Sequence, residues 1–175
     1  VSLRIGALTE PVAVAVRIAE LAGDVSGQTV LIIGAGPIGL LALQALEAKG
    51  AKQIFVSELD AARLAMVREL GGISLDPKTD NVVETAREAT SGLGVPVTID
   101  AVGSKITRTQ AVSATRPTGT VILSGLHEEI SEMPAADIIR REITIRGCFA
   151  YSPANFSTAL TLLAEGRMRL DPWIV

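Results

Sequence analysis

The sequence predicts an α/β protein built on a six-stranded, doubly wound parallel sheet with the strand order 3-2-1-4-5-6. Short apolar runs rich in β-branched residues alternate with helical patterns, and the runs are almost uncharged, as in strands buried on both faces. Helical stretches of about 10–15 residues between strands favour right-handed crossovers and parallel neighbours. The six expected strands are residues 29–33, 53–57, 73–75, 97–100, 120–123 and 143–146.

Residues that start or stop helices bound the segments between these strands. Asp60, Asp80 and Ser104 can each cap a helix N-terminus, and Ser152 followed by Pro153 marks the start of the last helix. The expected helices are residues 10–22, 38–49, 61–70, 81–90, 105–116 and 153–165. Apolar residues at helical spacing predict the buried faces of two of them, Leu64, Val67 and Leu70 in one and Phe156, Ala159, Leu160 and Leu163 in the last.

Composition excludes several functional classes. The 175 residues include 16 Lys and Arg against 19 Asp and Glu, and only 3% are aromatic, so nucleic-acid binding is not expected. A hydrophobic share of 48% argues against disorder. One cysteine, Cys148, and one histidine, His127, exclude a disulfide framework and a Cys/His zinc site within this chain. The single cysteine is compatible with a reducing cytosol, and we expect a cytoplasmic protein.

An uncharged stretch, residues 25–46, is long enough to mimic a membrane span. Gly34, Gly36, Pro37 and Gly39 interrupt its middle. A buried strand that turns into a buried helix explains the stretch better, so no membrane association is expected.

The strongest local signal is Gly34-Ala35-Gly36-Pro37-Ile38-Gly39, which follows a buried strand and opens a helix, the setting in which G-x-G-x-x-G indicates a dinucleotide-binding Rossmann fold. Gly34 permits the tight turn, Gly36 lets backbone approach a pyrophosphate, and Gly39 lets the helix pack closely on the strand. The helix N-terminus at Pro37 and Ile38 then offers N–H groups and a positive dipole end to the phosphates. The alternative is a tight strand–helix turn without a ligand.

An acid near the end of the next strand completes this pattern. Glu58 lies nineteen residues after Gly39, where a carboxylate can accept hydrogen bonds from both ribose hydroxyls and repel a 2′-phosphate. This favours NAD over NADP. Arg63 could cover the adenine side or be a solvent-facing helix residue, and the competing acid Asp60 is better used as a helix cap.

His127 and Cys148 each have a structural explanation. His127 stands in a loop after a strand and is expected to be an incidental surface residue. Cys148 follows Gly147 among apolar residues, where a buried and unactivated thiol is expected.

On these residues the chain resembles the coenzyme-binding domain of zinc-dependent medium-chain alcohol dehydrogenases, and most of all the polyol branch of sorbitol, 2,3-butanediol and threonine dehydrogenases. The resemblance covers almost the whole chain. It rests on Glu10-Pro11-Val12-Ala13-Val14, Gly34 to Gly39, Val56-Ser57-Glu58 with Arg63, Asp100-Ala101-Val102-Gly103, Pro117-Thr118-Gly119-Thr120, Ser124-Gly125-Leu126, Gly147-Cys148-Phe149-Ala150-Tyr151 and Leu170-Asp171-Pro172.

The resemblance implies roles for several of these residues. Backbone groups of Leu126, Cys148 and Ala150 would hold the nicotinamide carboxamide. Val102 and Gly103 would line the adenosine and nicotinamide ribose side of the cofactor site. Glu10 would approach the catalytic zinc or its water, or else be a first-turn helix acid favoured by the helix dipole. Tyr151 would border the substrate or else be core packing.

The resemblance also implies what this chain does not contain. Residues 1–26 are expected to be a connecting segment and helix, and residues 27–175 the NAD-binding domain. The zinc ligands would lie in a catalytic domain outside it, so zinc belongs to the parent enzyme and the chain alone is expected to be inactive. That enzyme would transfer hydride between a small secondary alcohol or polyol and NAD. Sorbitol dehydrogenases carry an arginine where Ala150 stands, so butanediol-type relatives look nearer.

The sequence argues against three other functions. An NADPH-dependent, zinc-free quinone reductase relative is opposed by Glu58 and by Glu10-Pro11. A short-chain dehydrogenase would need Tyr-x-x-x-Lys, but Asn155 stands four residues after Tyr151. A non-enzymatic nucleotide-sensing module would share the glycine loop and Glu58, yet it leaves residues 147–151 unexplained.

The sixth expected strand, residues 143–146, should form a sheet edge. Its residues are apolar and β-branched, and a bare edge of that kind invites pairing with another strand. The resemblance implies pairing across a two-fold axis, so a homodimer through this strand is expected.

Overall fold

In the computed structural model, which describes residues 3–170, all six strands pair in parallel in one sheet. The sheet has the order β3-β2-β1-β4-β5-β6, so the expected order is confirmed. Asp171 and Pro172, which contribute to the family resemblance, lie outside the described residues. The strands are β1 (Thr29–Ile33), β2 (Gln53–Ser57), β3 (Ile73–Leu75), β4 (Val95–Asp100), β5 (Thr115–Leu123) and β6 (Thr144–Gly147).

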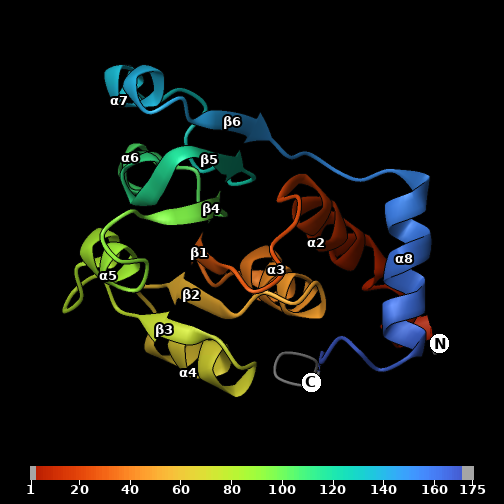
Figure 1. Ribbon diagram of the computed structural model, residues 1–175. Coiled ribbons are helices and arrows are strands. Elements are labelled where there is room, and N and C mark those ends of the chain that lie inside the picture. The colour runs from red at the N-terminus through yellow and green to blue at the C-terminus, as the bar shows by residue number, and fades with distance from the viewer. Residues whose placement is uncertain (1–2, 171–175) are drawn as a thin grey trace.

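Helices cover both faces of the sheet, giving three layers (Figure 1). In the described part of the chain they are α1 (Leu3–Gly6), α2 (Thr9–Leu21), α3 (Pro37–Ala48), α4 (Ala61–Glu69), α5 (Val82–Glu88), α6 (Lys105–Ala114), α7 (Ala135–Arg140) and α8 (Pro153–Ala164). None of them is long and apolar enough to cross a membrane.

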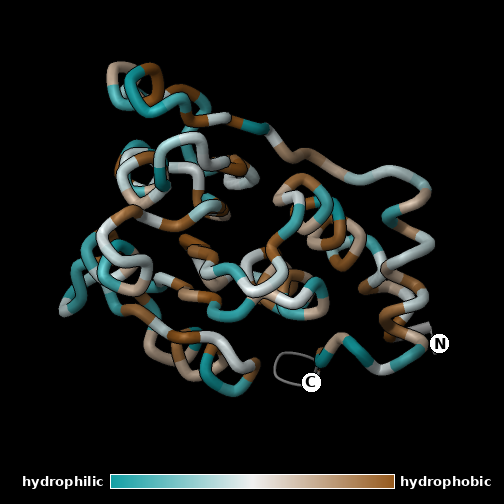
Figure 2. Tube along the Cα trace, in the orientation of Figure 1, coloured by the Kyte–Doolittle hydropathy of each residue, from teal (hydrophilic) through white to brown (hydrophobic). Residues whose placement is uncertain are grey.

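Each central strand supplies residues to two separate cores because successive side chains point to opposite faces. In β1, Val30 and Ile32 join the core under α2, α3, α4 and α8, and Leu31 and Ile33 join the core under α5 and α6. All five β1 residues are buried. Figure 2 shows the apolar stretches of the central strands enclosed between the helices.

Three strands differ from their expected bounds. β4 begins two residues earlier than residue 97, and β5 begins five residues earlier than residue 120, because their pairing is irregular. Val95 pairs with Thr115 but Val97 pairs with Thr120, so β5 bulges around Thr118, whose φ is +59°. β6 is displaced by one residue from the expected 143–146 and lies at the sheet edge, as expected.

The start of α5 was predicted wrongly. Asn81, and not Asp80, caps this helix, since its side chain accepts a hydrogen bond from Glu84 N at 3.2 Å. Asp80 instead accepts one from Asp76 N at 2.8 Å, which closes the preceding turn. The helix also ends at Glu88 rather than at residue 90.

Other expectations about the helices hold with small changes. Asp60, Ser104 and Ser152 cap α4, α6 and α8, and Leu64, Val67 and Leu70 are buried as predicted. In α8, Leu160 is 38% exposed and Leu162 is buried in its place. The sequence did not predict the short helices α1 and α7.

Candidate functional site

The glycine loop between β1 and α3 brings the helix against the strand. Gly34 has a φ of +101°, and a Cβ there would lie 2.7 Å from Val102 Cγ2. A Cβ on Gly39 would lie 1.9 Å from the carbonyl oxygen of Gly34. Gly36 differs from both, because its φ of −68° suits any residue and its Cβ would meet no atom within 4 Å. The fold therefore requires glycine at positions 34 and 39 but not at position 36.

The first turn of α3 leaves backbone donors available. Leu40 N donates to Gly36 O at 3.0 Å and closes the first helical turn. Within residues 3–170, the amides of Ile38 and Gly39 have no hydrogen-bond partner, and Pro37 has no amide hydrogen. The positive end of the α3 dipole and free N–H groups thus meet at the open side of Gly36.

Glu58, just beyond the end of β2, lies against this loop. Its Oε2 accepts a hydrogen bond from Ala35 N at 2.9 Å, and its Oε1 accepts from Leu59 N at 2.7 Å and Asp60 N at 3.1 Å. Arg63 Nη1 lies 3.6 Å from Oε2. The Glu58 side chain is only 11% exposed, so three backbone donors hold the carboxylate in one place beside the glycine loop.

A cavity of about 440 Å³ opens between the ends of β1, β2 and β4. Glu58 and Ser57 line one side, and Val102 and Ile106 supply apolar surface on the other. This size falls within the range of small-molecule sites. The remaining lining residues are Ile33, Gly34, Leu59, Pro77, Ser104, Thr107, Gln110 and His127.

The loops that follow β4 and β5 touch backbone to backbone. A Cβ on Gly103 would lie 2.1 Å from Gly125 O, so both loops depend on glycine for this approach. His127 N donates to Val102 O at 3.1 Å, and Asp100 Oδ1 accepts from the amides of Val102 and Gly103 at 3.0 and 2.9 Å. Sequence reasoning gave Asp100 no role, although an acid that ends a strand before a glycine turn could have indicated one.

The three residues expected at the nicotinamide offer backbone groups in loops. Leu126 is 75% exposed, and in the described part of the chain no hydrogen bond reaches its N–H or C=O. Cys148 N donates to Leu123 O at 2.8 Å. Within residues 3–170, no hydrogen bond reaches the Cys148 carbonyl or the N–H and C=O of Ala150, so these groups are available to a ligand. Burial raises the pKa of the Cys148 thiol, and the charge of Arg17 opposes this shift weakly. Cys148 is thus the unactivated thiol that was expected.

The two residues expected near the chemistry lie in α2 and just before α8. Glu10 is exposed in the first turn of α2. Tyr151 is half-buried, with its ring stacked on Phe156 at a centroid distance of 5.8 Å. Among residues 3–170, no group of three or more His, Cys, Asp or Glu side chains could hold a metal ion. The described residues therefore do not fit a zinc site.

Comparison with known proteins agrees with this geometry. A family model described as zinc-binding dehydrogenase matches residues 37–165. The (R,R)-butanediol dehydrogenase of Bacillus subtilis (strain 168) is 36% identical over 95% of this chain, and the sorbitol dehydrogenase of Bos taurus is 34% identical over 97%. The crystal structure of 2R,3R-butanediol dehydrogenase from Bacillus subtilis covers the whole chain with a TM-score of 0.92 and 34% identity.

A further structure bears on the cofactor. A Sinorhizobium meliloti 1021 protein described as a zinc-binding dehydrogenase was solved with NADP bound, and it covers 95% of this chain with a TM-score of 0.87 and 31% identity. The chain spans about half the length of each of these proteins, 48% of the two sequence relatives and 50% of the two structures. Since the family model matches residues 37–165, which is more than half of the chain and runs from the start of α3 to the end of α8, the chain belongs to the zinc-binding dehydrogenase family.

Proposed function

We propose that residues 27–175 are the NAD(H)-binding domain of a zinc-dependent alcohol or polyol dehydrogenase, and that residues 1–26 connect it to a catalytic domain. The whole enzyme would transfer hydride between a secondary alcohol or diol and NAD. Gly36 carries this proposal. The fold does not need glycine there, yet a side chain would project into the open space beside the free amides of Ile38 and Gly39. A pyrophosphate needs that space and those donors.

The adenosine half of the cofactor would occupy the cavity beside Glu58. Three backbone N–H groups occupy three of the roughly four acceptor positions of the carboxylate, so Oε2 keeps one position for a ribose hydroxyl. A 2′-phosphate at the same place would meet a nearly buried negative charge. Glu58 therefore supports NAD, even though one related structure binds NADP.

The nicotinamide half would lie along Leu126, Cys148 and Ala150. The carbonyls of Leu126 and Cys148 would accept hydrogen bonds from the NH₂ group of the nicotinamide carboxamide, and the Ala150 N–H would donate to its oxygen. When bound, NAD supplies the ring carbon that accepts or gives the hydride. The role of the backbone is to orient that ring, while Tyr151 would form one wall of the substrate pocket and Glu10 would approach the zinc of the parent enzyme.

The edge of the sheet at β6 would form the interface of a homodimer. β6 is the sheet edge, α7 beside it has no buried residue, and Ile139 and Ile130 are 74% and 89% exposed. These exposed apolar side chains support a homodimer through β6. A cytoplasmic location is proposed on the single buried cysteine alone.

Replacing Gly36 and Gly39 by alanine tests the dinucleotide site. Gly36→Ala should leave the free energy of unfolding within about 0.5 kcal/mol of wild type, because its Cβ meets no atom. The same variant should bind NADH about 100-fold more weakly. Gly39→Ala should instead lower the free energy of unfolding by about 1–3 kcal/mol, since its Cβ overlaps Gly34 O. Urea denaturation and NADH fluorescence titration measure both, and undiminished NADH binding by Gly36→Ala would falsify the proposal.

Glu58→Gln tests the choice between NAD and NADP. The amide keeps the size of the side chain but loses the charge that repels a 2′-phosphate. The preference for NADH over NADPH should fall by about tenfold, corresponding to roughly 1.4 kcal/mol. Glu69→Gln, at an exposed position in the neighbouring helix α4, is the matched control and should keep the wild-type preference. An unchanged preference in Glu58→Gln would refute the assignment of this acid.

The catalytic activity of the chain alone is a third test. Because the described residues fit no zinc site, the chain with added zinc should oxidise neither 2,3-butanediol nor sorbitol, while it still binds NADH. NADH formation followed by absorbance measures this. Zinc-dependent turnover by the chain alone would show that the division into two halves is wrong.

The dimer is tested by a proline at the sheet edge. Cys148 N points toward β5. Because successive residues of a strand point to opposite sides, the Gly147 N–H points away from the sheet, where a second strand would pair. A Cβ at Gly147 would meet no atom within 4 Å, so a side chain fits there. Gly147→Pro removes that donor and should give a monomer by light scattering, whereas Gly147→Ala should keep the dimeric mass. A monomeric wild type would count against the dimer.

A further inference from the structure

The segment that would contact the nicotinamide is fastened at its two ends and exposed in its middle. It runs from β6 to α8, across the molecule from the sheet edge (Figure 1). At one end, Cys148 is buried and its N–H is bonded to Leu123 O. In the middle, Phe149 is 86% exposed and Ala150 has a φ of +57°, a conformation that alanine rarely adopts. Such a backbone persists only where its surroundings hold it.

Asn155 fastens the other end. The residue is 5% exposed, and its Oδ1 accepts hydrogen bonds from Ser152 N at 2.9 Å and Ser152 Oγ at 2.7 Å. Ser152 Oγ in turn accepts from Asn155 N, which completes the capping box of α8. The backbone two residues after Ala150 is thereby tied to one amide side chain.

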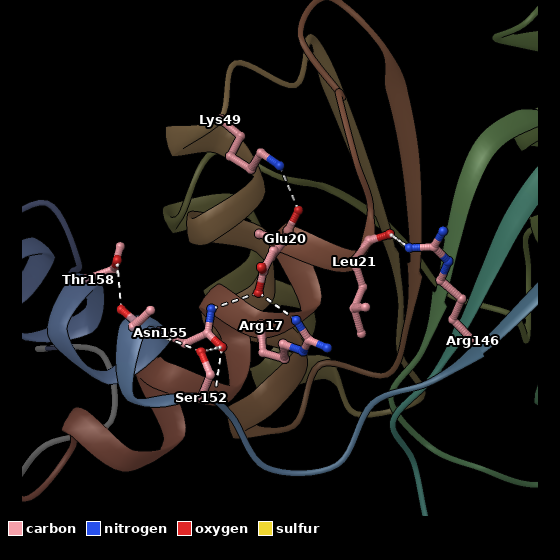
Figure 3. A network of polar contacts seen from close by, with 10 residues as sticks. Arg17, Glu20, Leu21, Lys49, Arg146, Ser152, Asn155 and Thr158 are labelled. Atoms are coloured by element: carbon pink, nitrogen blue, oxygen red, sulfur yellow. Dashed lines mark hydrogen bonds and ion pairs between the residues drawn. The ribbon is translucent and has the colours of Figure 1, made fainter.

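Glu20 of α2 orients that amide (Figure 3). Asn155 Nδ2 donates to Glu20 Oε2 at 2.9 Å, and Arg17 Nη1 donates to the same oxygen at 2.7 Å. The hydrogen bonds from Asn155 and then Arg17 lower the pKa of Glu20. A carboxylate accepts only, so it holds Nδ2 toward α2 and leaves Oδ1 facing Ser152.

We propose that Asn155, oriented by Glu20, is a positioning residue that sets the backbone of Ala150 for the nicotinamide. This inference rests on the proposed NAD-binding function. A capping residue that served only α8 would not need a partner on α2, 135 positions away in the chain. The Glu20–Asn155 hydrogen bond makes α2 part of the nicotinamide end of the proposed site. A small displacement of the backbone groups that hold a ligand lowers its affinity steeply.

The test compares NADH with ADP-ribose, which shares the adenosine and pyrophosphate but has no nicotinamide. In Asn155→Asp the two bonds from Ser152 can persist, while the new carboxylate faces Glu20 and the link to α2 is lost. NADH should bind about tenfold more weakly to this variant, and ADP-ribose should bind within about twofold of wild type by calorimetry. Glu20→Gln keeps an acceptor oxygen for Asn155 and should retain wild-type binding of both ligands.

Two further variants make the test decisive. Glu20→Ala removes the link from its half-exposed partner and should reproduce the selective loss even if Asn155→Asp fails to fold. Thr158→Ala, in the same helix, removes a hydroxyl whose one hydrogen bond within the described residues goes to Ala154 O, and it should change neither affinity. Equal weakening of both ligands, or no weakening, in the variants that break the link overturns the positioning role. A wild-type chain that binds neither ligand overturns the proposed function itself.

Discussion

The close approach of α3 to β1 is the constraint on which the rest of the site depends. A single Cβ at Gly39 would overlap the Gly34 carbonyl, and one at Gly34 would strike Val102 on the neighbouring strand end. With both contacts free of side chains, the first turn of α3 lies directly over the end of the sheet. Its free amides directly follow the loop whose Ala35 N–H is bonded to Glu58, so one backbone turn orients both the proposed phosphate donors and the proposed ribose acid.

This approach is stabilised by a core drawn from distant parts of the chain. α2 and α8, near opposite ends of the described residues, pack with α3 in one cluster that includes Val12, Ile18, Leu43 and Leu163. Polar contacts close its rim, since Lys49 Nζ donates to Ala19 O and Gly23 O, and the Gln44 amide bonds the backbone of Arg169. α3, whose first turn carries the proposed phosphate donors, is therefore held by helices near both ends of the described residues.

Sequence periodicity was enough to predict the sheet, because strands buried on both faces are uninterrupted apolar runs, as in Thr29–Ile33. The glycine turn between β1 and α3 and the position of Glu58 just after β2 were predictable from local spacing, while the cofactor roles of these residues stay predictions. The cap of α5 was mistaken since Asp80 and Asn81 are adjacent and equally suited to capping, and only the turn at Asp76 decides between them. The contact between Glu20 and Asn155 has no local signature, because α2 and α8 meet only in the folded chain.

The two ends of the proposed cofactor site place different demands on the sequence. At the proposed adenosine end a side chain, Glu58, would provide the recognition, so its identity would be constrained. At the other end Leu126, Cys148 and Ala150 offer backbone atoms, which most residues could present provided the backbone conformation is kept. In the proposed site, Ala150 stands where the resemblance implies an arginine in sorbitol dehydrogenases, and this change would alter what lies beside the substrate while the same N–H would still face the nicotinamide. The positive φ of Ala150 then matters more than its methyl group, and the residues that hold this backbone become as important to the site as those that touch the ligand.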